Sequence, residues 1–588
     1  MVRDDDLLSV QEARDLVEKA YQAARQFRAF SQEQVDAVID AMAAAADASA
    51  ETLAQEAVQE TGYGVVADKI IKNRLGSRGV YQAIRGMKTV GILREDSQAG
   101  IVEIAEPVGV VAAVLPTTNP TSTAIYKILI SLKGRNAIVL SPHPNAFNCT
   151  CHVADIMYQA ARQAGAPEHV IGCIRRPTLP GTQELMKHRR TGVILSTGGT
   201  GIVRAAYSSG KPAYGVGPGN VPALLEKTCD VKKAVADVVA GTTFDNGTLC
   251  SSEQALVTCE ALREQVLIEL AANGAYLLNE QEAAAVARVL ITPNFTVNAK
   301  FVGKAATVIA QAAGLSVPPQ TRVLVANVAG VGREYPLSAE KLSPVLALYF
   351  VKDFAEALDR CESLLRFGGM GHTCSIHSKD EARIREYGLR MPAFRVVVNS
   401  PSTHGSVGLT TGLFPAMTLG CGALGGNVTG DNVGPMHLIN IKRIAYEKRT
   451  AASLSGGASA PAPSSQLSAI SYQPAAVSSS ALTPDKQTIS RIVQEFMAHK
   501  GVTPSAPSAL APAPSPIPHP PSPAPAVPPQ APPPAVVDFV SESDVRIAIN
   551  KQEKIHIGPR TIVTPAARDL AGGNDVLVMH HSATSKRN

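Results

Sequence analysis

Apolar and polar positions along the first part of the chain form blocks that alternate between the strand pattern and the helix pattern. The first 60 residues have helical spacing and predict two or three helices. From residue 101 onward, continuous apolar runs typical of buried strands alternate with helical stretches. This alternation predicts an α/β fold with a doubly wound parallel sheet. The predicted strands lie at 108–115, 136–140, 170–174 and 192–195, with helices at 121–133 and 147–164.

Polar and glycine-rich turns follow three of these strands, at 116–119, 141–144 and 196–201. In open parallel sheets, ligands bind beyond the carboxyl ends of the strands, where these turns emerge together. The turn with Gly198, Gly199 and Gly201 permits close approach of a phosphate to the start of a helix. It lacks the full dinucleotide fingerprint, so a simple chain reversal is an equal alternative for this turn.

The composition changes sharply near residue 450. The mixture of apolar, charged and turn residues that is typical of a globular domain ends there, and segments dominated by a few residue types follow. Residues 451–482 are mostly Ala, Ser, Gly and Pro, and 502–537 are dominated by Pro and Ala. Such segments bury too little apolar surface to offset chain entropy, which predicts a largely disordered C-terminal tail.

Between these two linkers, residues 483–501 predict one amphipathic helix. Thr483 and Pro484 suit its start, and Gly501 suits its end. An isolated helix of this length is marginal, so we expect it to dock on a partner, or alternatively to fold back on its own globular domain. Its apolar stripe consists of Ile489, Ile492, Val493, Phe496 and Met497.

A last segment, 538–580, contains short apolar patterns that predict a helix, a strand and a second helix. Val545, Ile547 and Ile549 belong to the first, 555–557 to the strand, and 560–570 to the second helix. The segment is too small to be an independent enzyme, and we interpret it as a further docking element.

Overall composition narrows the classes of function. A chain of 588 residues is expected to fold into at least two packed units. The formal charge of +5 without a clustered basic run argues against nucleic acid as a partner. Nine cysteines without metal-ligand spacing indicate a reducing compartment and no metal. Without a signal-peptide pattern or a run of roughly 18 apolar residues, we expect a cytoplasmic protein with no membrane segment.

Cys250 is the candidate nucleophile, because it alone among the cysteines follows an Asn-Gly pair in a small, polar loop. Such a loop can expose a thiol. The alternative is that Cys250 is a buried small hydrophobic residue, since free cysteine is among the most buried residue types and no adjacent His or Lys lowers its pKa.

Seven short motifs, in order, resemble the CoA-acylating branch of the aldehyde dehydrogenase superfamily. More narrowly, residues 8–445 resemble the propionaldehyde and acetaldehyde dehydrogenases of bacterial microcompartments. The resemblance implies an aldehyde dehydrogenase-like fold and makes Cys250 the nucleophile that attacks the aldehyde carbon. The motifs start at Glu106 (EPVG), Leu115 (LPTTNPT), Ser141 (SPHP), Ser196 (STGGT), Gly217 (GPGN), Cys250 (CSSE) and Glu340 (EKLSP).

The resemblance also assigns Asn119, whose side-chain N–H would form an oxyanion hole with the backbone N–H of Cys250. Its alternative role is that of a turn residue before Pro120. In hydrolytic relatives, a Glu-Leu-Gly-Gly-Lys motif supplies the base that activates water, but residues 215–220 occupy its place here. No Asp or Glu occurs between Glu184 and Glu226, so coenzyme A is the expected acyl acceptor.

The expected hydride acceptor is NAD. Glu340 matches the ribose-binding glutamate of the family, although an ordinary surface carboxylate is the alternative. The lysine that many relatives place near the adenosine ribose is replaced by 141–144, which makes NADP less favoured. His143 either contacts the cofactor or fills its turn. His372 and His404 lie in glycine-rich loops and are interpreted as pocket-wall residues, with an active-site base as the alternative for either. The predicted cofactor contacts are Pro116, Thr117, Ser141, His143, Gly199, Thr200, Val216 and Glu340.

The resemblance further implies a domain plan and partners. The expected parts are a cofactor-binding domain at 8–225 completed by 406–430, a catalytic domain at 226–405, and an oligomerisation arm at 431–448, read as a strand over 432–445. The arm implies a homodimer or homotetramer. The 483–501 helix resembles encapsulation peptides that bind microcompartment shell proteins, and 554–570 is similar to Thr-Pro-Ala-Ala-Arg motifs of other microcompartment proteins.

Three functions follow from these observations. The favoured one converts a short-chain aldehyde, CoA and NAD to acyl-CoA and NADH inside a bacterial microcompartment. The second is a hydrolytic aldehyde dehydrogenase with a relocated base, which would form free acid without CoA. The third is a shell-interacting scaffold protein, suggested by the tail alone.

Overall fold

The computed structural model describes residues 4–293, 295–451, 537–551, 553–564, 567–568, 571 and 576–579. The chain divides into two compact units, Met1–Ala462 and Pro463–Asn588. The predicted helix at 483–501 lies outside the described residues, as do the predicted linkers apart from residues 451 and 537. None of the described helices is long and apolar enough to cross a membrane.

The first unit opens with three helices, as the helical spacing of the first 60 residues predicts. The carboxylate of Asp4 caps α1 (Asp5–Phe27) by accepting a hydrogen bond from the backbone of Leu7. Ser31 and Gln34 form a capping box at the start of α2 (Gln32–Ala48). The following helices are α3 (Ala50–Thr61), α4 (Val66–Arg74), the π-helical turn Leu75–Gly79 and α5 (Val80–Ile84).

A five-stranded parallel sheet forms the core of the first half, in the order β5-β4-β3-β6-β7. The chain moves outward from β3 through β4 to β5, then returns to the other side of β3 with β6 and β7. The order therefore reverses beside β3, as in a doubly wound sheet. The strands are β3 (Val110–Val114), β4 (Ala137–Ser141), β5 (Ile171–Cys173), β6 (Thr191–Thr197) and β7 (Ala213–Val216).

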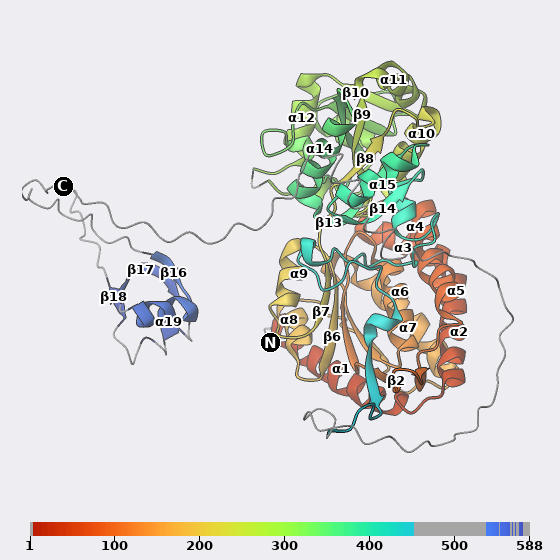
Figure 1. Cartoon of the computed structure of the whole chain (residues 1–588), viewed down its shortest axis with the longest axis vertical. Coiled ribbons are helices and arrows are strands. Elements are labelled where there is room, and N and C mark those ends of the chain that lie inside the picture. The colour runs from red at the N-terminus through yellow and green to blue at the C-terminus, as the bar shows by residue number, and fades with distance from the viewer. Residues whose placement is uncertain are drawn as a thin grey trace, which may run out of the picture. The chain divides into compact units, whose positions relative to one another are not determined.

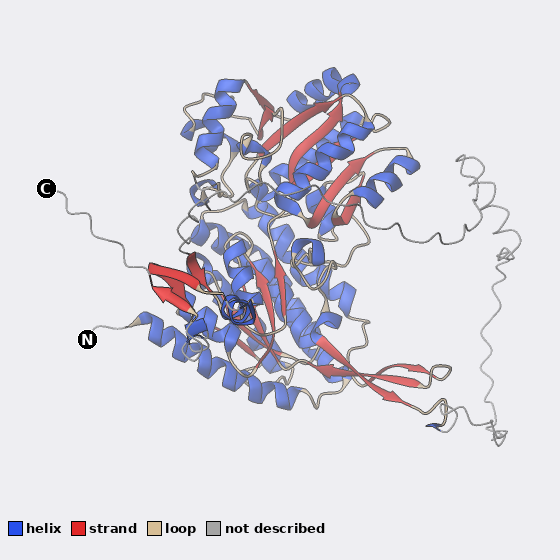
Figure 2. Cartoon of the chain, turned by 60° about the vertical axis from the view of Figure 1, so that its left-hand side comes forward, coloured by secondary structure: helices blue, strands red, loops and turns tan. Residues whose placement is uncertain are grey.

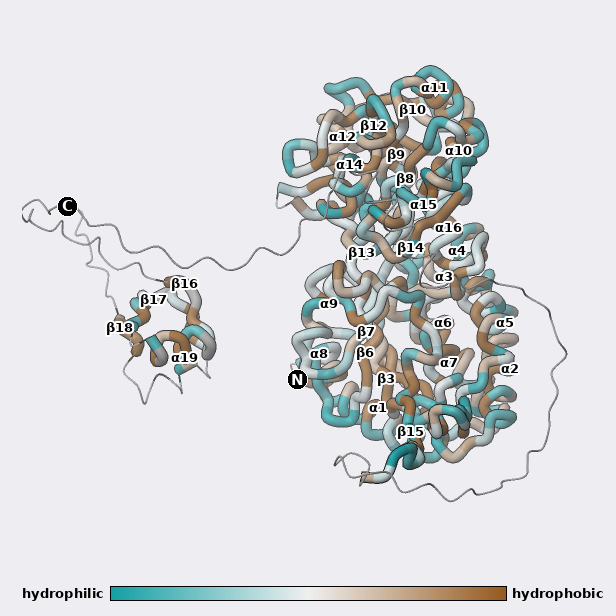
Figure 3. The backbone as a smooth tube through the Cα atoms, viewed as in Figure 1, coloured by the Kyte–Doolittle hydropathy of each residue, from teal (hydrophilic) through white to brown (hydrophobic). Residues whose placement is uncertain are grey.

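Helices cover both faces of this sheet, with α6 and α7 on one side and α8 and α9 on the other (Figure 1). Every residue of α6 is buried, and Pro120 occupies its first turn, where no backbone donor is needed. The strands of this sheet are largely brown in Figure 3, whereas the outer helices are more hydrophilic. The helices are α6 (Pro120–Lys133), α7 (Phe147–Gln163), α8 (Leu179–Lys187) and α9 (Thr200–Tyr207).

A second, seven-stranded parallel sheet has the order β10-β11-β12-β9-β8-β13-β14. Its strands are β8 (Val221–Leu225), β9 (Glu253–Cys259), β10 (Ala275–Leu278), β11 (Val323–Asn327), β12 (Val345–Val351), β13 (Gly371–His377) and β14 (Ala393–Val398). The accompanying helices are α10 (Val231–Thr243), α11 (Arg263–Ala272), α12 (Glu280–Leu290), α13 (Ala306–Ala312), α14 (Phe354–Leu364), α15 (Glu381–Arg390) and α16 (Ser402–Ser406).

Strand pairing corrects one expected boundary. The predicted cofactor-binding domain ends at residue 225, but β8 pairs with β9 and β13 of the second sheet. The chain changes sheets earlier, in the turn after β7. Further along, Val407, Ala416, Met417 and Leu419 are buried in the apolar core of the first sheet, so the chain returns there after α16.

A third sheet is antiparallel, with the order β1-β2-β15, and projects from the body of the first unit (Figure 2). It consists of β1 (Ile92–Asp96), β2 (Ile101–Pro107) and β15 (Ile439–Ala445). The strand predicted over 432–445 is shorter than expected, because a 3₁₀ turn at Pro435–Leu438 precedes β15. Pro435 lacks the backbone donor that an earlier strand pairing would need.

The second unit contains β16 (Val537–Val540), α19 (Glu542–Lys551), β17 (Ile555–Val563) and β18 (Leu577–Met579). The three strands form a parallel sheet in the order β16-β17-β18. The predicted first helix and the strand at 555–557 are present. The prediction missed β16 and β18, and it placed a helix from residue 560 where β17 continues to Val563. The β-branched residues Thr561, Ile562 and Val563 favour that extended conformation.

Candidate active site

The loop that carries Cys250 joins α10 to β9 and contains an unusual turn. Asp245, Asn246 and Gly247 have φ values of 50°, 53° and 73°, all in the left-handed region. A Cβ at position 247 would also lie 3.0 Å from the backbone of Ser343, so only glycine fits there. The turn directs the following residues back toward the first sheet and leaves Cys250 half-buried.

The thiol of Cys250 lies beside an imidazole. His372 Nε2 is 3.1 Å from Cys250 Sγ, and His372 is fully buried. Burial raises the pKa of Cys250 to about 12, and the Glu340 carboxylate and Cys421 contribute in the same direction. Burial, followed by the Arg395 guanidinium, lowers the pKa of His372 well below its ordinary value. At neutral pH the pair is therefore a thiol and a neutral imidazole, which can accept the thiol proton.

Neighbouring strands hold this imidazole in place. His372 is the second residue of β13, and its Nδ1 lies 2.9 Å from Thr373 Oγ1. Arg395, on β14, donates to that same hydroxyl at 3.2 Å and to the carbonyl of His372 at 2.8 Å. The sequence favoured a pocket-wall role for His372 over that of an active-site base, because the pairing of β13 with β8 that brings it to Cys250 is not visible in the sequence.

Within the segment 215–220, two glycines have no room for a side chain. At Gly215, an added Cβ would lie 2.7 Å from Val203 and 2.9 Å from the ring of Tyr207. At Gly219, it would lie 2.0 Å from the carbonyl oxygen of Cys250 and 3.2 Å from His372. Packing thus excludes a side chain at 215 and 219, whereas a Cβ added at Gly217 would meet nothing within 4 Å.

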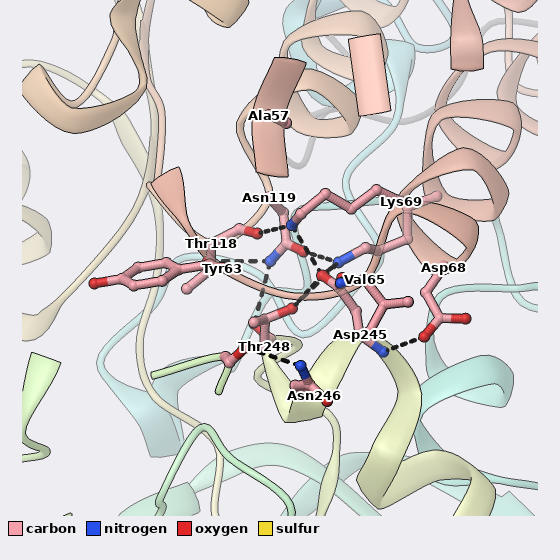
Figure 4. A network of polar contacts seen from close by, with 12 residues as sticks. Ala57, Tyr63, Val65, Asp68, Lys69, Thr118, Asn119, Asp245, Asn246 and Thr248 are labelled. Atoms are coloured by element: carbon pink, nitrogen blue, oxygen red, sulfur yellow. Dashed lines mark hydrogen bonds and ion pairs between the residues drawn. The ribbon is translucent and has the colours of Figure 1, made fainter. Parts of the chain in front are cut away.

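Asn119 lies at the carboxyl end of the first sheet, just before α6, and is 8% exposed. Its Nδ2 donates to Thr248 O at 3.2 Å and to Thr118 Oγ1 at 3.1 Å. Its Oδ1 accepts from Lys72 Nζ at 2.5 Å. One N–H of the Asn119 amide is therefore directed at the loop that carries Cys250, two residues before the cysteine (Figure 4).

Beneath Asn119 lies a cluster of buried charges that sequence reasoning missed. Lys69 and Lys72 of α4 both form ion pairs with Asp245 Oδ2, and the Lys69 distance is 3.0 Å. Thr248 Oγ1 donates to the same oxygen at 2.6 Å, and the backbone of Val65 donates to Oδ1 at 2.6 Å. The cluster links α4 to the nucleophile loop, as Figure 4 shows. The only signal in the sequence was a pair of lysines three positions apart on an otherwise amphipathic helix.

The ionisation of this cluster follows from its charges. Burial opposes ionisation of Asp245, but Lys72 and Lys69 outweigh it, so the pKa of Asp245 lies below its ordinary value. Burial lowers the pKa of Lys72 to about 8, against the opposing attraction of Asp245. Asp68 accepts a hydrogen bond from the backbone of Asp245 at 2.7 Å, and burial raises its pKa.

The structure brings the predicted cofactor contacts of the first sheet to a single edge. Each follows the carboxyl end of β3, β4, β6 or β7, on both sides of the point where the strand order reverses. Pro116, Ser141 and Val216 are buried, Thr117 is half-buried, and His143, Gly199 and Thr200 are exposed. His143 caps the 3₁₀ turn Pro144–Ala146 through its Nδ1, so it also fills the turn, as the alternative interpretation holds.

The geometry at the start of α9 fits a phosphate group. Gly199 is the N-cap residue of this helix, and no side chain caps it. A Cβ added at Gly199 or Gly201 would meet nothing within 4 Å. The uncapped backbone donors and the open space beside them match what a dinucleotide pyrophosphate needs at a helix start.

Glu340 reaches the site from the loop before β12. Its Oε1 accepts a hydrogen bond from the backbone of Gly219 at 3.0 Å, and burial raises its pKa to about 8. His404 lies away from the thiol, with its ring centroid 4.6 Å from that of Phe244. Among the described residues, no group of His, Cys, Asp and Glu is arranged to hold a metal ion.

Comparisons with known proteins agree with this geometry. The aldehyde dehydrogenase family model matches residues 6–316. The chain is 46% identical over 442 residues to the bifunctional aldehyde-alcohol dehydrogenase AdhE of Escherichia coli K12, covering 74% of this chain and 50% of that protein. The chain thus spans about half the length of the curated relatives it matches first.

Solved structures cover the same part of the chain. An acetylating aldehyde dehydrogenase from Geobacillus thermoglucosidasius is 50% identical, with a TM-score of 0.75, and the match covers 76% of this chain and 99% of that one. A propionaldehyde dehydrogenase from the Clostridium phytofermentans fucose utilisation bacterial microcompartment is 28% identical, with a TM-score of 0.67, over 75% of this chain and 98% of that one. The chain therefore belongs to the aldehyde dehydrogenase family, among its CoA-acylating members.

Proposed function

We propose that this protein oxidises a short-chain aldehyde with NAD and transfers the acyl group to coenzyme A. The observation that carries the proposal is the Cys250–His372 pair, at 3.1 Å, in a site where Gly215 and Gly219 leave no room for a carboxylate side chain at their own positions. A thiol is a good acyl acceptor without a strong base, whereas water is not. The relatives with acetylating and propionaldehyde dehydrogenase activity support this class.

The first step is the attack of Cys250 Sγ on the aldehyde carbon. With a proton on Nδ1 donated to Thr373 Oγ1, His372 presents its Nε2 lone pair to the thiol. The thiol proton passes to Nε2 as the C–S bond forms, and the carbonyl oxygen gains negative charge. Because the thiol pKa of about 12 is far above neutral pH, this proton transfer is required for attack.

Asn119 and the backbone N–H of Cys250 are the proposed donors to that oxygen. The amide of Asn119 already points toward the nucleophile loop. Its 3.1 Å bond to the rotatable Thr118 hydroxyl is the contact most readily exchanged for the developing oxyanion. Each such donor typically contributes about 10²–10³ to the rate.

NAD, when bound, would supply the hydride acceptor, and loss of hydride from the thiohemiacetal carbon would leave an acyl thioester on Cys250. The open start of α9 would hold its pyrophosphate, and Glu340 would bind the nicotinamide ribose hydroxyls. Near the adenosine ribose, the 141–144 turn contains no lysine or arginine, which disfavours a 2′-phosphate and so favours NAD over NADP.

The thiol of CoA then attacks the thioester carbon. Before this step, His372 releases to solvent the proton that it took from Cys250. The imidazole then accepts the CoA proton and passes it to the Cys250 sulfur, so that acyl-CoA leaves and the thiol is restored. The test is NADH formation from propionaldehyde and NAD, with and without CoA, on the full chain. Turnover that requires CoA and yields propionyl-CoA supports the proposal, whereas CoA-independent formation of propionate overturns it.

One observation favours a second candidate. Glu340 is a carboxylate near Cys250 with a pKa of about 8, so it could activate water as the base of a hydrolytic enzyme. Its Oε1 is already bound to the backbone of Gly219, which favours the ribose role. The Glu340→Gln variant distinguishes the two roles. Loss of CoA-independent acid formation would identify Glu340 as the base of a hydrolytic enzyme. An increase in the KM for NAD with no other change would identify Glu340 as a ribose-binding residue.

We further propose that the protein acts in the lumen of a cytoplasmic bacterial microcompartment, as a homodimer or homotetramer. The projecting β1-β2-β15 sheet and the microcompartment relative support these parts of the proposal. Shell proteins would bind the 483–501 segment, with 538–580 as a further docking element. The test is deletion of 451–588. A truncated enzyme that still co-localises with shells would contradict shell docking by the tail.

A further inference from the structure

Helix α4 has an inverted burial pattern. Lys69 and Lys72 are 2% and 1% exposed, whereas Ile71 between them is 43% exposed. An ordinary amphipathic helix would bury the isoleucine and expose the lysines, because burial of a charge is costly unless it is paired. The pattern therefore indicates a role for the buried ammonium groups beyond packing.

The contacts of Lys72 show what that role is. Its Nζ donates to Asn119 Oδ1 at 2.5 Å, to Asp245 Oδ2 and to Thr248 Oγ1 at 3.2 Å. These three acceptors use all three donors of the ammonium group. The cation thus joins Asn119, at the edge of the first sheet, to Asp245 and Thr248 of the loop that carries Cys250.

The contact with Asn119 determines which way its amide faces. An ammonium group can only donate, so the amide oxygen must point toward Lys72 and the NH₂ group must point away from it. The NH₂ group then meets Thr248 O, two residues before Cys250. A flipped amide would place N–H groups against the ammonium and direct an oxygen lone pair at the developing oxyanion.

We propose that Lys72 is a positioning residue that fixes the amide orientation of Asn119 and thereby aims its N–H at the oxyanion of the Cys250 adduct. The inference rests on one part of the proposed function, namely that Asn119 stabilises the oxyanion. It is independent of the acyl acceptor, because the thiohemiacetal oxyanion forms before either CoA or water enters.

Lys69 provides a matched control on the same helix. It is equally buried and pairs with the same oxygen of Asp245, at 3.0 Å. Its other partner is the carbonyl of Thr118, at 2.9 Å, and none of its hydrogen bonds reaches the Asn119 side chain. Loss of either lysine removes one buried cation from Asp245, but only loss of Lys72 releases the amide of Asn119.

The experiment compares kcat for propionaldehyde in Lys72→Met, Lys69→Met, Asn119→Ala and the Lys72→Met/Asn119→Ala double variant. We expect Asn119→Ala to lower kcat by about 10²-fold. Lys72→Met should lower it by about tenfold to a hundredfold, and Lys69→Met by less than about threefold. In the Asn119→Ala background, Lys72→Met should change kcat by less than about threefold, because the residue on which it acts is gone.

Two further measurements distinguish a positioning role of Lys72 from a role in folding alone. The KM for NAD and the alkylation rate of Cys250 should change by less than about threefold in Lys72→Met, since neither depends on the oxyanion donor. If Lys72→Met does not fold, Lys72→Gln and Lys69→Gln replace the methionine pair. The glutamine at 72 retains an N–H donor and should keep more activity than methionine where both fold.

Two results would overturn the inference: equal losses of kcat in the Lys69 and Lys72 variants, or fully multiplicative losses in the double variant. A different result would contradict the proposed function. Wild-type protein that forms propionate without CoA would overturn the acylating class, while the comparison of the two lysines would still report on the oxyanion.

Discussion

The two sides of the active site are built in contrasting ways. On the nucleophile side, Cys250, His372 and Asn119 are held by buried hydrogen bonds and by the Lys72–Asp245 ion pair. On the cofactor side, Gly199 and Thr200 are exposed at an uncapped helix start with open space beside them. The groups proposed to perform the chemistry are held in place by the fold itself, whereas the proposed cofactor edge is open to a large ligand.

The difference has an energetic cause. A buried charge must keep its partners, so the polar groups around Asp245 cannot rearrange independently. A helix start facing solvent is satisfied by water until a ligand displaces it. Changes to Cys250, His372, Asn119 or Lys72 should therefore affect kcat, and changes on the cofactor side should affect KM.

Replacement of the nucleophile tests this contrast most strongly. Cys250→Ala removes the sulfur that is proposed to carry the acyl group and should lower kcat by about 10⁴-fold or more. NAD binding, measured by fluorescence titration, should remain within about threefold of wild type. An acylating activity that survives in Cys250→Ala would mean that another thiol is the nucleophile.

His372→Ala should have the next largest effect. Without Nε2, the thiol of Cys250 loses the proton acceptor to which it is hydrogen-bonded, so kcat should fall by about 10²–10³-fold. The KM for NAD should stay within about threefold, because His372 lies on the nucleophile side. Steady-state kinetics with propionaldehyde and CoA measure both values, and a change confined to KM would assign His372 to binding instead.

The thiol pKa predicts a pH dependence in the protein without cofactor. Because the pKa of Cys250 is raised to about 12, the thiolate fraction increases with pH throughout the range below that value. Alkylation by iodoacetamide, followed on the Cys250 peptide by mass spectrometry, should accelerate about a hundredfold between pH 7 and 9. A plateau below pH 9 would show that His372 holds the thiol as a thiolate–imidazolium pair.

The smallest effect is expected on the cofactor side. In Gly199→Ala the added methyl group meets nothing within 4 Å, so thermal stability should be unchanged. The methyl group would crowd a phosphate at the start of α9 and raise the KM for NAD roughly tenfold, with kcat retained. Gly201→Ala, equally free of contacts, is the matched control one step further into the helix. If Gly199→Ala has the same KM for NAD as the wild-type protein, the pyrophosphate of NAD lies elsewhere.

Features encoded in short stretches could be predicted from the sequence. The apolar runs that became β3, β4, β5 and β6 have the period of buried strands, and the motifs around Cys250 and Asn119 carry the family resemblance. Each depends on residues close together in the chain. For the same reason, the prediction placed the polar turns at one sheet edge without knowing the path of the chain between them.

Tertiary structure alone decided which distant residues meet. His372 lies 122 positions from Cys250 in the sequence, and Lys72 lies 47 from Asn119. The pairing of β8 with β9 and β13 moved the domain boundary and brought the imidazole to the thiol. A sequence shows that α4 contains lysines, but only packing removes them from water and gives them a single set of partners. The reason is physical: periodicity is a property of neighbours along the chain, whereas burial and charge pairing depend on the whole fold.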